Sequence, residues 1–318
     1  MKSNNKISVL MSVYNEKDEW VIKAVNSILT QDYENYELII IIDNPNRDIS
    51  HIKVAVERHN NVLIKINEKN IGLADSLNRA ASMANGSYLA RMDADDISLP
   101  GRLKCQFDYL QKYDYDMVGG AIELINDQEE PISFSRLPSD LSLLKKLVKY
   151  RTICFHPTWL LKREVYDLIN GYRAFPAAQD LDFILRALDK GVKISNVSDV
   201  VLKYRINDNS ISVKKSLIQR RCQRFAHKLS KKRFNNNGVD GFTNKSMMKA
   251  IRVSRTLEYL HNISNRLIKK SSFLRKKGNG ILASIYLFLS IIISYEQFIF
   301  VYKAVASKVI LRLNSNNS

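Results

Sequence analysis

The sequence predicts an α/β protein in which a doubly wound, nucleotide-binding sheet is followed by a helical C-terminal extension. Four short apolar runs are separated by segments of helical spacing within the first 93 residues, which is the pattern of consecutive βα units. One of these runs, Leu38–Ile42, is apolar without interruption, as expected for a strand buried on both faces of a parallel sheet. With 318 residues, 45% of them apolar, the chain is long enough for one large hydrophobic core or two smaller ones.

The order of the predicted elements follows from this alternation. The four N-terminal strands are Ile7–Val13, Leu38–Ile42, Val62–Ile66 and Tyr88–Met92, and helices are expected around 21–28, 52–59 and 73–84. Further along we expect a helix at Gly101–Tyr113, strands at Met117–Ile125 and Ile132–Phe134, a helix at Ser139–Lys149, a strand at Thr158–Leu161, a short helix closed by Asn170-Gly171, and a helix that faces inward through Phe183, Leu185 and Leu188.

Polar side chains follow each of the four N-terminal strands. In doubly wound sheets, ligands bind outside the carboxyl ends of the strands, so these loops should converge on one crevice. The loops carry Tyr14, Asn15, Glu16, Asp43, Asn44, Asn70, Gly72, Asp93 and Asp95. No G-x-G-x-x-G follows the first strand, which argues against NAD or FAD as the ligand.

Two carboxylates stand where the fourth strand ends. Alternate residues of a strand share a face, so Asp93 and Asp95 should point the same way, about 6–7 Å apart. Such a pair can hold one Mg²⁺ or Mn²⁺ and leave open positions for the phosphates of a nucleoside diphosphate. The alternative is a solvated acidic turn in which Asp96 or Ser98 caps the helix that begins near Gly101.

Two further aspartates have a functional and a structural interpretation each. Asp43 can accept a hydrogen bond from a base N–H or a ribose hydroxyl, or it can be a turn residue before Pro45. Asp180 can act as a base that faces the same crevice, or it can be an acid favoured by the dipole at the start of a helix.

Charge and cysteine content indicate the surroundings of the protein. Cys105, Cys154 and Cys222 form no C-x-x-C pair and no signal peptide precedes the first strand, so we expect a reduced, cytoplasmic protein. The net charge is +17, and residues 201–280 hold 21 Lys and Arg against three acids. This excess predicts that the C-terminal third binds an acidic surface, either nucleic acid or anionic lipid.

Two segments of the C-terminal third favour lipid. Lys214–Arg233 has nine basic residues and no acid, with apolar positions at helical spacing, so it is either a membrane-binding amphipathic helix or a helix packed on the protein with a solvated basic face. Ile281–Tyr302 contains one charged residue, Glu296, in 22 residues, which is long enough to cross a bilayer. Basic residues at both ends give no orientation, and polar residues form a stripe along it, so we favour a helix that lies in or dips into the cytoplasmic leaflet, or packs against a neighbour, over a spanning one.

The ordered set of short motifs resembles the inverting glycosyltransferases of family 2, which have the GT-A fold. The motifs are SVYNE, IIDNP, NIGLADSLNRA, ARMDADD, FHPT, INGYR, AQDLDFILR and YRINDNSIS, and they cover roughly residues 6–213. The resemblance therefore implies a catalytic domain at 1–213, and the basic and apolar segments described above predict a membrane-associating helical region at 214–318.

The resemblance also implies roles for individual residues. The uracil and ribose would be lined by Tyr14, Glu16 and Asp43, and the nucleotide would lie above Asn70 and Gly72. Asp93 would contact ribose and metal, and Asp95 would bind the metal. The pyrophosphate would lie near Tyr204 and Arg205, and Asp180 would be the catalytic base. The chain departs from the family pattern at two of these motifs. The E-D pair is Gln179-Asp180 here, and Asn207 stands where many members have a histidine, which puts a contact from that histidine in doubt.

Together these observations predict a metal-dependent, inverting transfer of a hexose from a nucleoside-diphosphate sugar, with UDP as the expected nucleotide. The acceptor expected for such an enzyme at a membrane is a saccharide on a polyprenyl diphosphate, as in O-antigen or capsule synthesis. One alternative is a nucleotidyltransferase, although no Gly-rich, basic phosphate loop follows the first strand. The other is a basic nucleic-acid-binding protein, but its Lys and Arg residues are not interleaved with an aromatic stacking platform, which argues against it.

Overall fold

The computed structural model describes residues 5–206 and 216–315. The described residues form two compact units. The first lies within Met1–Lys145, Thr152–Phe175 and Gln179–Ser210, and the second within Lys146–Arg151, Pro176–Ala178 and Ile211–Ser318.

The first unit contains one mixed sheet. Its strands are β1 (Ile7–Val13), β2 (Tyr36–Ile42), β3 (Val62–Ile66), β4 (Tyr88–Asp93), β5 (Ile97–Ser98), β6 (Met117–Ile125), β7 (Pro131–Ser135), β8 (Leu160–Lys162) and β9 (Ile194–Arg205). They are arranged in the order β3-β2-β1-β4-β8-β6-β9-β5, with β7 paired to β6. The first four are parallel to one another as predicted, whereas β8 is antiparallel to both of its neighbours.

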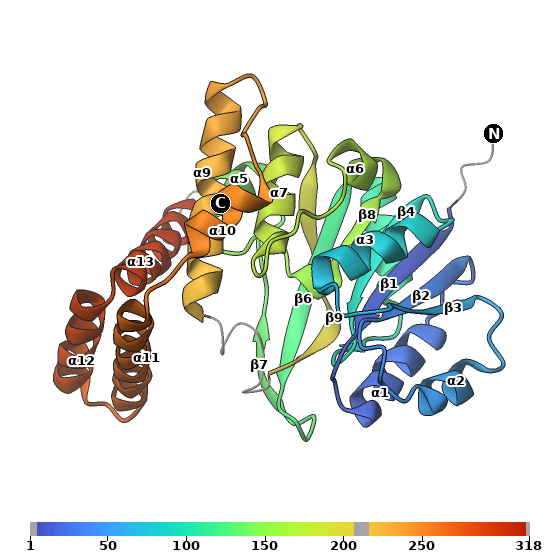
Figure 1. The fold of residues 1–318 in the computed structure, drawn as a ribbon, viewed down its shortest axis with the longest axis horizontal. Helices are drawn as coiled ribbons and strands as arrows, with labels where there is room; N and C mark the ends of the chain where they lie inside the picture. Colours follow the sequence, from blue (N-terminus) through green and yellow to red (C-terminus); the bar gives the residue numbers. More distant parts are fainter. Residues whose placement is uncertain (1–4, 207–215, 316–318) are drawn as a thin grey trace. The chain divides into compact units, whose positions relative to one another are not determined.

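Helices connect the strands of this sheet. They are α1 (Asp18–Leu29), α2 (Ser50–Val56), α3 (Leu73–Met83), α4 (Arg102–Lys112), α5 (Leu141–Leu147), the 3₁₀ turn η1 (His156–Thr158), α6 (Arg163–Leu168) and α7 (Gln179–Asp189). Right-handed crossovers place α1 and α2 on one face of the parallel strands and α3 on the other, and Figure 1 shows α3 lying across β1. All residues of β1 and β2 are buried, which agrees with their apolar sequences.

A buried carboxylate links the amino ends of neighbouring central strands through hydrogen bonds. Glu37 of β2 accepts hydrogen bonds from Ser8 Oγ of β1 at 2.6 Å, from Lys6 Nζ at 2.8 Å and from the backbone N–H of Asn85 at 2.6 Å. Burial alone would raise the pKa of Glu37, but these hydrogen bonds lower it to about 2. The carboxylate therefore links β1, β2 and the turn before β4 at the end of the sheet away from the predicted site.

We expect Glu37→Gln to lower the free energy of unfolding by about 1–3 kcal/mol near neutral pH, because a charged acceptor of three hydrogen bonds is lost. Since the pKa is depressed from its usual 4.5, this stabilisation is present above that value and disappears as the pH falls toward 2. Urea unfolding at about pH 7 and about pH 3 measures it, with exposed Glu34→Gln as the control. A difference between wild type and Glu37→Gln that stayed the same at both pH values would contradict this role.

The second unit is helical. It contains α9 (Ser216–Asn235), α10 (Asn244–Ile251), α11 (Arg255–Lys276), α12 (Gly280–Ile293) and α13 (Tyr295–Ser315). The predicted basic helix corresponds to α9, and its first two predicted residues, Lys214 and Lys215, lie outside the described residues.

The apolar segment 281–302 is not one helix. Ser294 has extended backbone angles (φ −135°, ψ 114°) and separates α12 from α13. Within the described ranges, no helix is both long enough and apolar enough to cross a membrane.

Candidate active site

The sheet has a topological switch point at β1, which lies between β2 and β4. The chain leaves β1 toward β2 and later returns to pair β4 on the other side of β1, so the loops after β1 and β4 diverge and open a crevice at the carboxyl end of the sheet. Glu16 follows β1, while Asp93 and Asp95 come from the end of β4, with Asp93 in register with Ser12. The sequence therefore predicted correctly where these three acids gather.

The three acids lie close enough to affect one another. Burial, and then the charges of Asp93 and Glu16, raise the pKa of Asp95 to about 7. The pKa of Glu16 is also raised, mainly by burial, with a contribution from Asp93. The crevice thus holds a concentration of negative charge that the surrounding protein does not fully neutralise.

Arg91 fixes the first of these acids and was not predicted from the sequence. Its guanidinium is buried, donates to Asp93 Oδ1 and also donates to the carbonyl of Met92. Arg102 donates to the carbonyl of Arg91 at 2.7 Å and to that of Pro157 at 2.8 Å, which holds the strand end in place. The spacing of Arg91 and Asp93 did contain a signal, because residues i and i+2 of a strand share a face.

Asp96 is the fourth acid of this turn, and it is buried. Its Oδ1 accepts the backbone N–H of Arg205 at 2.8 Å, and its Oδ2 has no hydrogen-bond partner among the described atoms. Burial and the charges of Asp95 and Asp93 raise its pKa well above the usual value. The alternative prediction, in which Asp96 or Ser98 caps α4, is wrong, because the N-cap position is Gly101 and no side chain caps it.

The guanidinium of Arg205 is used within the protein. It donates to the carbonyl of Asp95 at 2.8 Å and to those of Asn126 and Asp127 at 3.2 Å, forms an ion pair with Glu129 at 3.2 Å, and lies over the Trp20 ring. Arg205 thereby positions the backbone of Asp95, and a direct contact with pyrophosphate stays a prediction.

Tyr204 lies on the same strand, β9, within reach of the acids. Burial and the charges of Asp96, Asp93 and Asp95 raise the pKa of its hydroxyl. The hydroxyl therefore stays protonated and can donate a hydrogen bond to a phosphate oxygen, as the prediction requires.

Asp43 organises the loop that precedes α3. Its Oδ1 accepts from Asn67 Nδ2 at 2.7 Å and from the N–H of Ile71 at 2.9 Å, and its Oδ2 accepts from the N–H of Gly72 at 2.8 Å. Gly72 has φ +86°, a conformation that favours glycine, and it precedes α3 directly. Asn70 is exposed on this loop, so a nucleoside contact by Asp43 would be made by a carboxylate already fixed in place.

The loop after β1 is fixed by Arg47, another residue that the sequence did not indicate. Arg47 donates to the carbonyl of Tyr14 at 3.1 Å and to that of Glu16 at 2.8 Å, and it forms an ion pair with Asp18. Glu16 accepts the N–H of Tyr14 at 2.7 Å, which leaves the exposed Tyr14 ring at the rim of the crevice.

Asp180 begins α7 in the same unit. Burial raises its pKa, the backbone N–H groups of Leu181 and Asp180 lower it, and the charge of Asp93 raises it. The charge of Asp93 therefore acts on Asp180. The amide hydrogen bonds fit the interpretation of Asp180 as an acid at a helix N-terminus, and its role as the base stays a prediction.

Asp182, the other acid in the first turn of α7, has a structural environment instead. It is fully buried, accepts from Arg186 Nε at 2.8 Å and lies 3.7 Å from Arg173. Asn207, the departure from the family histidine, lies outside the described residues.

The acid cluster suits a divalent cation that arrives with a nucleotide. No group of three or more His, Cys, Asp or Glu side chains in the described part of the chain could hold a metal ion alone. Magnesium, however, is commonly bound by one or two carboxylates together with substrate phosphates. Burial and then repulsion between carboxylates raise the pKa values of Asp95 and Asp96, and these shifts, with the unpartnered buried oxygen of Asp96, fit a cation beside Asp93 and Asp95.

A mixed sheet with four parallel N-terminal strands and a carboxylate-lined crevice at its switch point is typical of nucleotide-binding α/β enzymes. The chain belongs to glycosyl transferase family 2, whose model matches residues 8–169. It is therefore a glycosyltransferase with the GT-A fold and a helical C-terminal region.

Individual relatives support this assignment. The chain is 30% identical over 238 residues to the glycosyltransferase MJ1057 of Methanocaldococcus jannaschii, covering 73% of this chain and 82% of that one. It is 35% identical over 209 residues to the O-antigen biosynthesis glycosyltransferase WbnJ of Escherichia coli, covering 64% and 81%. It is 27% identical over 212 residues to the UDP-Glc:alpha-D-GlcNAc-diphosphoundecaprenol beta-1,3-glucosyltransferase WfgD of Escherichia coli, covering 66% and 80%.

A solved structure shows the same fold. S. aureus TarS 1–349 in complex with UDP-GlcNAc superposes with a TM-score of 0.61 at 16% identity, covering 97% of this chain and 92% of that chain.

Proposed function

We propose that this glycosyltransferase moves a hexose from a UDP-sugar to a saccharide on a polyprenyl diphosphate, with inversion at the anomeric carbon, in surface-polysaccharide synthesis. The observation that carries the proposal is the gathering of the Asp93 and Asp95 carboxylates at the switch point, where the charge of Asp93 also acts on Asp180. The named activities of WbnJ and WfgD support the pathway and the lipid-linked acceptor. TarS, which was solved with UDP-GlcNAc, supports the nucleotide.

The chemistry assigned to the chain is one in-line displacement. The acceptor hydroxyl attacks the anomeric carbon, Asp180 takes the hydroxyl proton, and the bond from that carbon to the diphosphate oxygen breaks, with the electron pair leaving on the nucleoside diphosphate. Burial and the charge of Asp93 raise the pKa of Asp180 and so make its carboxylate a stronger base. An α-linked donor gives a β-glycoside.

Other residues hold the donor in place for this displacement. The nucleoside would be lined by Tyr14, Glu16 and Asp43, and Asn70 and Gly72 would lie beneath it. Asp93 and Asp95 would hold Mg²⁺ or Mn²⁺, which supplies positive charge at the leaving diphosphate. The Tyr204 hydroxyl would donate to a phosphate oxygen, and Arg205 would act through the backbone of Asp95.

The basic second unit is proposed to hold the enzyme peripherally on the cytoplasmic face of an anionic membrane, where lipid-linked acceptors are found. Its composition has no interleaved aromatic platform for nucleic acid, and none is proposed as a partner.

Product identity tests the reaction class. The full chain, mixed with a UDP-sugar, Mn²⁺ and a synthetic lipid-diphosphate saccharide, is expected to release UDP and no inorganic pyrophosphate. Chromatography of the nucleotides and a pyrophosphate assay measure this, and radiolabelled nucleotide sugars identify the hexose. Release of pyrophosphate with formation of a new nucleotide sugar would replace this proposal with nucleotidyl transfer.

A further inference from the structure

The contact between α11 and α12 is made by small polar residues. Ser264 Oγ donates to the carbonyl of Ser290 at 2.7 Å, and Ser271 Oγ donates to the carbonyl of Ala283 at 2.6 Å. His261 Nδ1 and Ser294 Oγ are 2.8 Å apart. All of these side chains are buried. Close approach through small residues and side-chain hydrogen bonds is typical of helices that associate in lipid.

The large apolar side chains of α12 point the other way. Ile281, Ile285, Phe288 and Ile292 recur at spacings of four, three and four, and they are 82%, 48%, 60% and 64% exposed. A helix pair in water normally buries such a stripe and exposes its polar face. Here the arrangement is reversed, and we call these four residues the α12 stripe.

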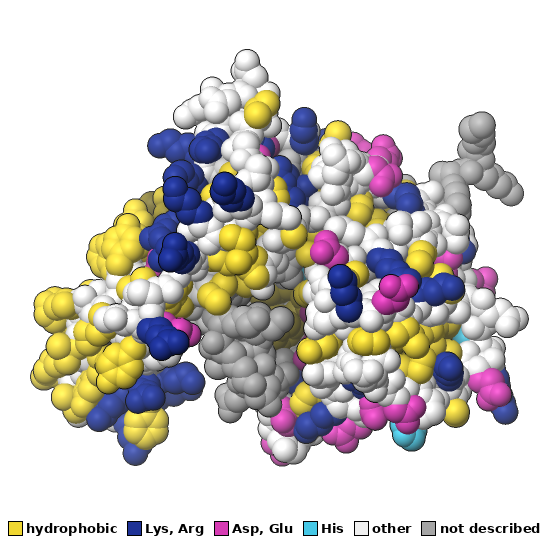
Figure 2. Space-filling view, in the orientation of Figure 1, with side chains coloured by type: hydrophobic (Ala, Val, Ile, Leu, Met, Phe, Trp, Pro, Cys, Tyr) yellow, Lys and Arg dark blue, Asp and Glu magenta, His cyan; other side chains and the backbone are white. Residues whose placement is uncertain are grey.

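A similar stripe continues on α13. Phe298, Tyr302, Val305 and Val309 are all about half exposed and also recur at helical spacing. Figure 2 shows hydrophobic side chains gathered over α12 and α13, with Lys and Arg side chains at their edge. An apolar surface of this extent marks an interaction site.

Positive charge surrounds the apolar surface. Residues 255–315 contain ten Lys and Arg against two acids, Glu258 and Glu296, and the turn that leads from α11 to α12 carries Arg275, Lys276 and Lys277. Glu296 is paired with Arg224 at 2.9 Å, so its charge is already compensated. An apolar face with a cationic border is complementary to a bilayer that contains anionic lipid.

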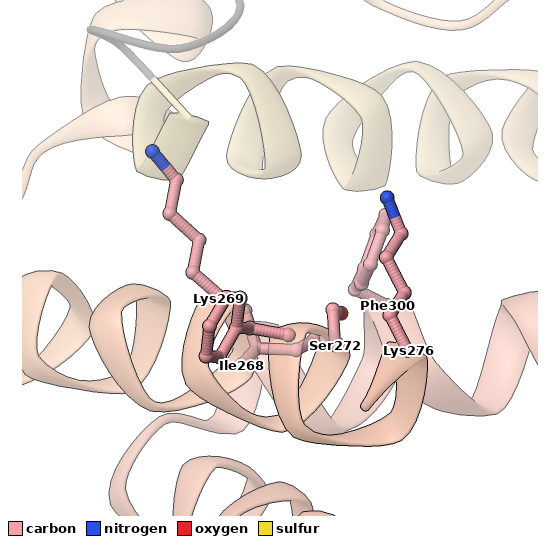
Figure 3. A pocket seen from close by; sticks show the side chains of 6 residues that line it. Ile268, Lys269, Ser272, Lys276 and Phe300 are labelled. Atoms are coloured by element: carbon pink, nitrogen blue, oxygen red, sulfur yellow. The ribbon is translucent and has the colours of Figure 1, made fainter. Parts of the chain in front are cut away.

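One groove in this unit has a lysine at each end (Figure 3). A cavity of about 420 Å³ is lined by Ile268, Lys269, Ser272, Phe273, Lys276 and Phe300. Figure 3 shows Lys269 and Lys276 at its two ends, extending to the same side, with Ser272 between them. In the part of the chain that the structure describes, neither lysine forms an ion pair, so both ammonium groups remain available to an anion.

We propose that α12 inserts its apolar stripe into one leaflet of an anionic bilayer and that the Lys269–Lys276 groove binds the phosphate of a lipid headgroup there. The 14 residues of α12 are about 21 Å long, less than the roughly 30 Å of a hydrocarbon core, so the helix enters the leaflet without crossing it. The inference rests on the proposed membrane attachment and adds the surface and the headgroup site that make it. It does not depend on the chemistry of transfer.

The stripe is tested with the full chain and vesicles of phosphatidylcholine with phosphatidylglycerol. A triple variant combines Ile285→Ser, Phe288→Ser and Ile292→Ser. It should lower the vesicle partition coefficient in high salt by about tenfold or more, because salt does not screen the burial of apolar surface. Ile132→Ser with Phe134→Ser, which removes two exposed apolar side chains of β7, is the matched control and should bind like wild type. Circular dichroism checks that each variant is folded.

Two outcomes of the vesicle experiment would contradict the proposal. If the folded triple variant still sediments with vesicles in high salt as wild type does, the stripe does not insert. If it instead loses self-association in the absence of vesicles, the stripe contacts a second copy, and the bilayer proposal is wrong. Turnover on a short water-soluble acceptor should be unchanged in the triple variant, so failure of the membrane inference is distinguishable from failure of the proposed chemistry.

The groove is tested with a pair of variants that remove equal charge from the same helix. Lys269→Gln with Lys276→Gln removes both groove lysines. Lys270→Gln with Lys277→Gln removes neighbours at the same spacing, whose ammonium groups lie over the rings of Tyr286 and Phe273. The first pair should weaken binding to phosphatidylglycerol vesicles several-fold more than the second. Equal losses would show that general attraction alone operates, without a headgroup site.

Discussion

Asp180→Asn is expected to reduce glycosyl transfer by about 10²-fold or more while leaving donor affinity nearly unchanged. The asparagine keeps the size of the side chain and an oxygen that accepts the amide hydrogen bonds at the start of α7, but it cannot take the proton of an acceptor hydroxyl. Turnover with a lipid-diphosphate saccharide, measured beside UDP-sugar affinity by calorimetry, tests this expectation. A parallel loss of affinity and turnover would make Asp180 a donor ligand and place the base elsewhere.

Asp182→Asn is the matched control, two residues along the same helix. Asp182 is fully buried in its ion pair with Arg186, so its neutral replacement removes the carboxylate charge from that buried pair. We expect this variant to lose stability by about 3–5 kcal/mol, measured by urea unfolding. Turnover per folded molecule should fall far less than in Asp180→Asn.

Asp95→Ala is expected to lower turnover at limiting Mn²⁺ by about 10²-fold or more, because mutation of even the outer partners of metal ligands costs 10–100-fold. Titrating Mn²⁺ at a fixed UDP-sugar concentration should show a rightward shift in the metal dependence of turnover. Near-normal turnover of the purified variant at limiting Mn²⁺ would remove Asp95 from the metal site.

Two further variants serve as comparisons for Asp95→Ala. Asp108→Ala removes an exposed acid of α4 that pairs only locally with Lys104, and its metal dependence should equal that of wild type. Asp93→Ala should additionally weaken UDP-sugar binding, and it also leaves the buried guanidinium of Arg91 without its carboxylate.

The parallel half of the sheet was predicted from the sequence, because its strands have apolar patterns and follow one another along the chain. Short apolar runs identified β1, β2 and β4. The rule that loops meet at the carboxyl ends of parallel strands placed Glu16, Asp93 and Asp95 together. The mixed half of the sheet was harder to predict, because paired residues of β6 and β9 are 77 to 80 positions apart and β5 contains only two residues. No local periodicity encodes such pairings.

The residues that fix the site were harder to predict than the residues that line it. Arg91, Arg47 and Arg205 each hold a backbone carbonyl or a carboxylate at the crevice, and for Arg47 and Arg205 those partners are distant in the sequence. A hydrogen bond from a guanidinium to a backbone carbonyl has no sequence signature, because every residue has a backbone carbonyl that can accept it. Arg205 was accordingly expected near the pyrophosphate, which stays a prediction, and its hold on protein atoms was not foreseen.

The division of the apolar segment at Ser294 has a similar cause. Serine is neither a strong helix former nor a breaker, so the sequence 281–302 does not show where the helix ends. The hydroxyl of Ser294 is held by His261 of α11, a contact 33 residues away. Tertiary structure therefore determined the boundary.

The acidic turn at the end of β4 has a consequence for the evolution of the enzyme. Carboxylates gathered beside one another repel, and the proposed cation would relieve this repulsion when it binds with the donor. Sequence changes that neutralise the turn would make the free protein more robust and a worse catalyst, so selection for thermal tolerance and selection for transfer act in opposite directions at these positions. Stabilising substitutions compatible with function should therefore accumulate elsewhere in the chain.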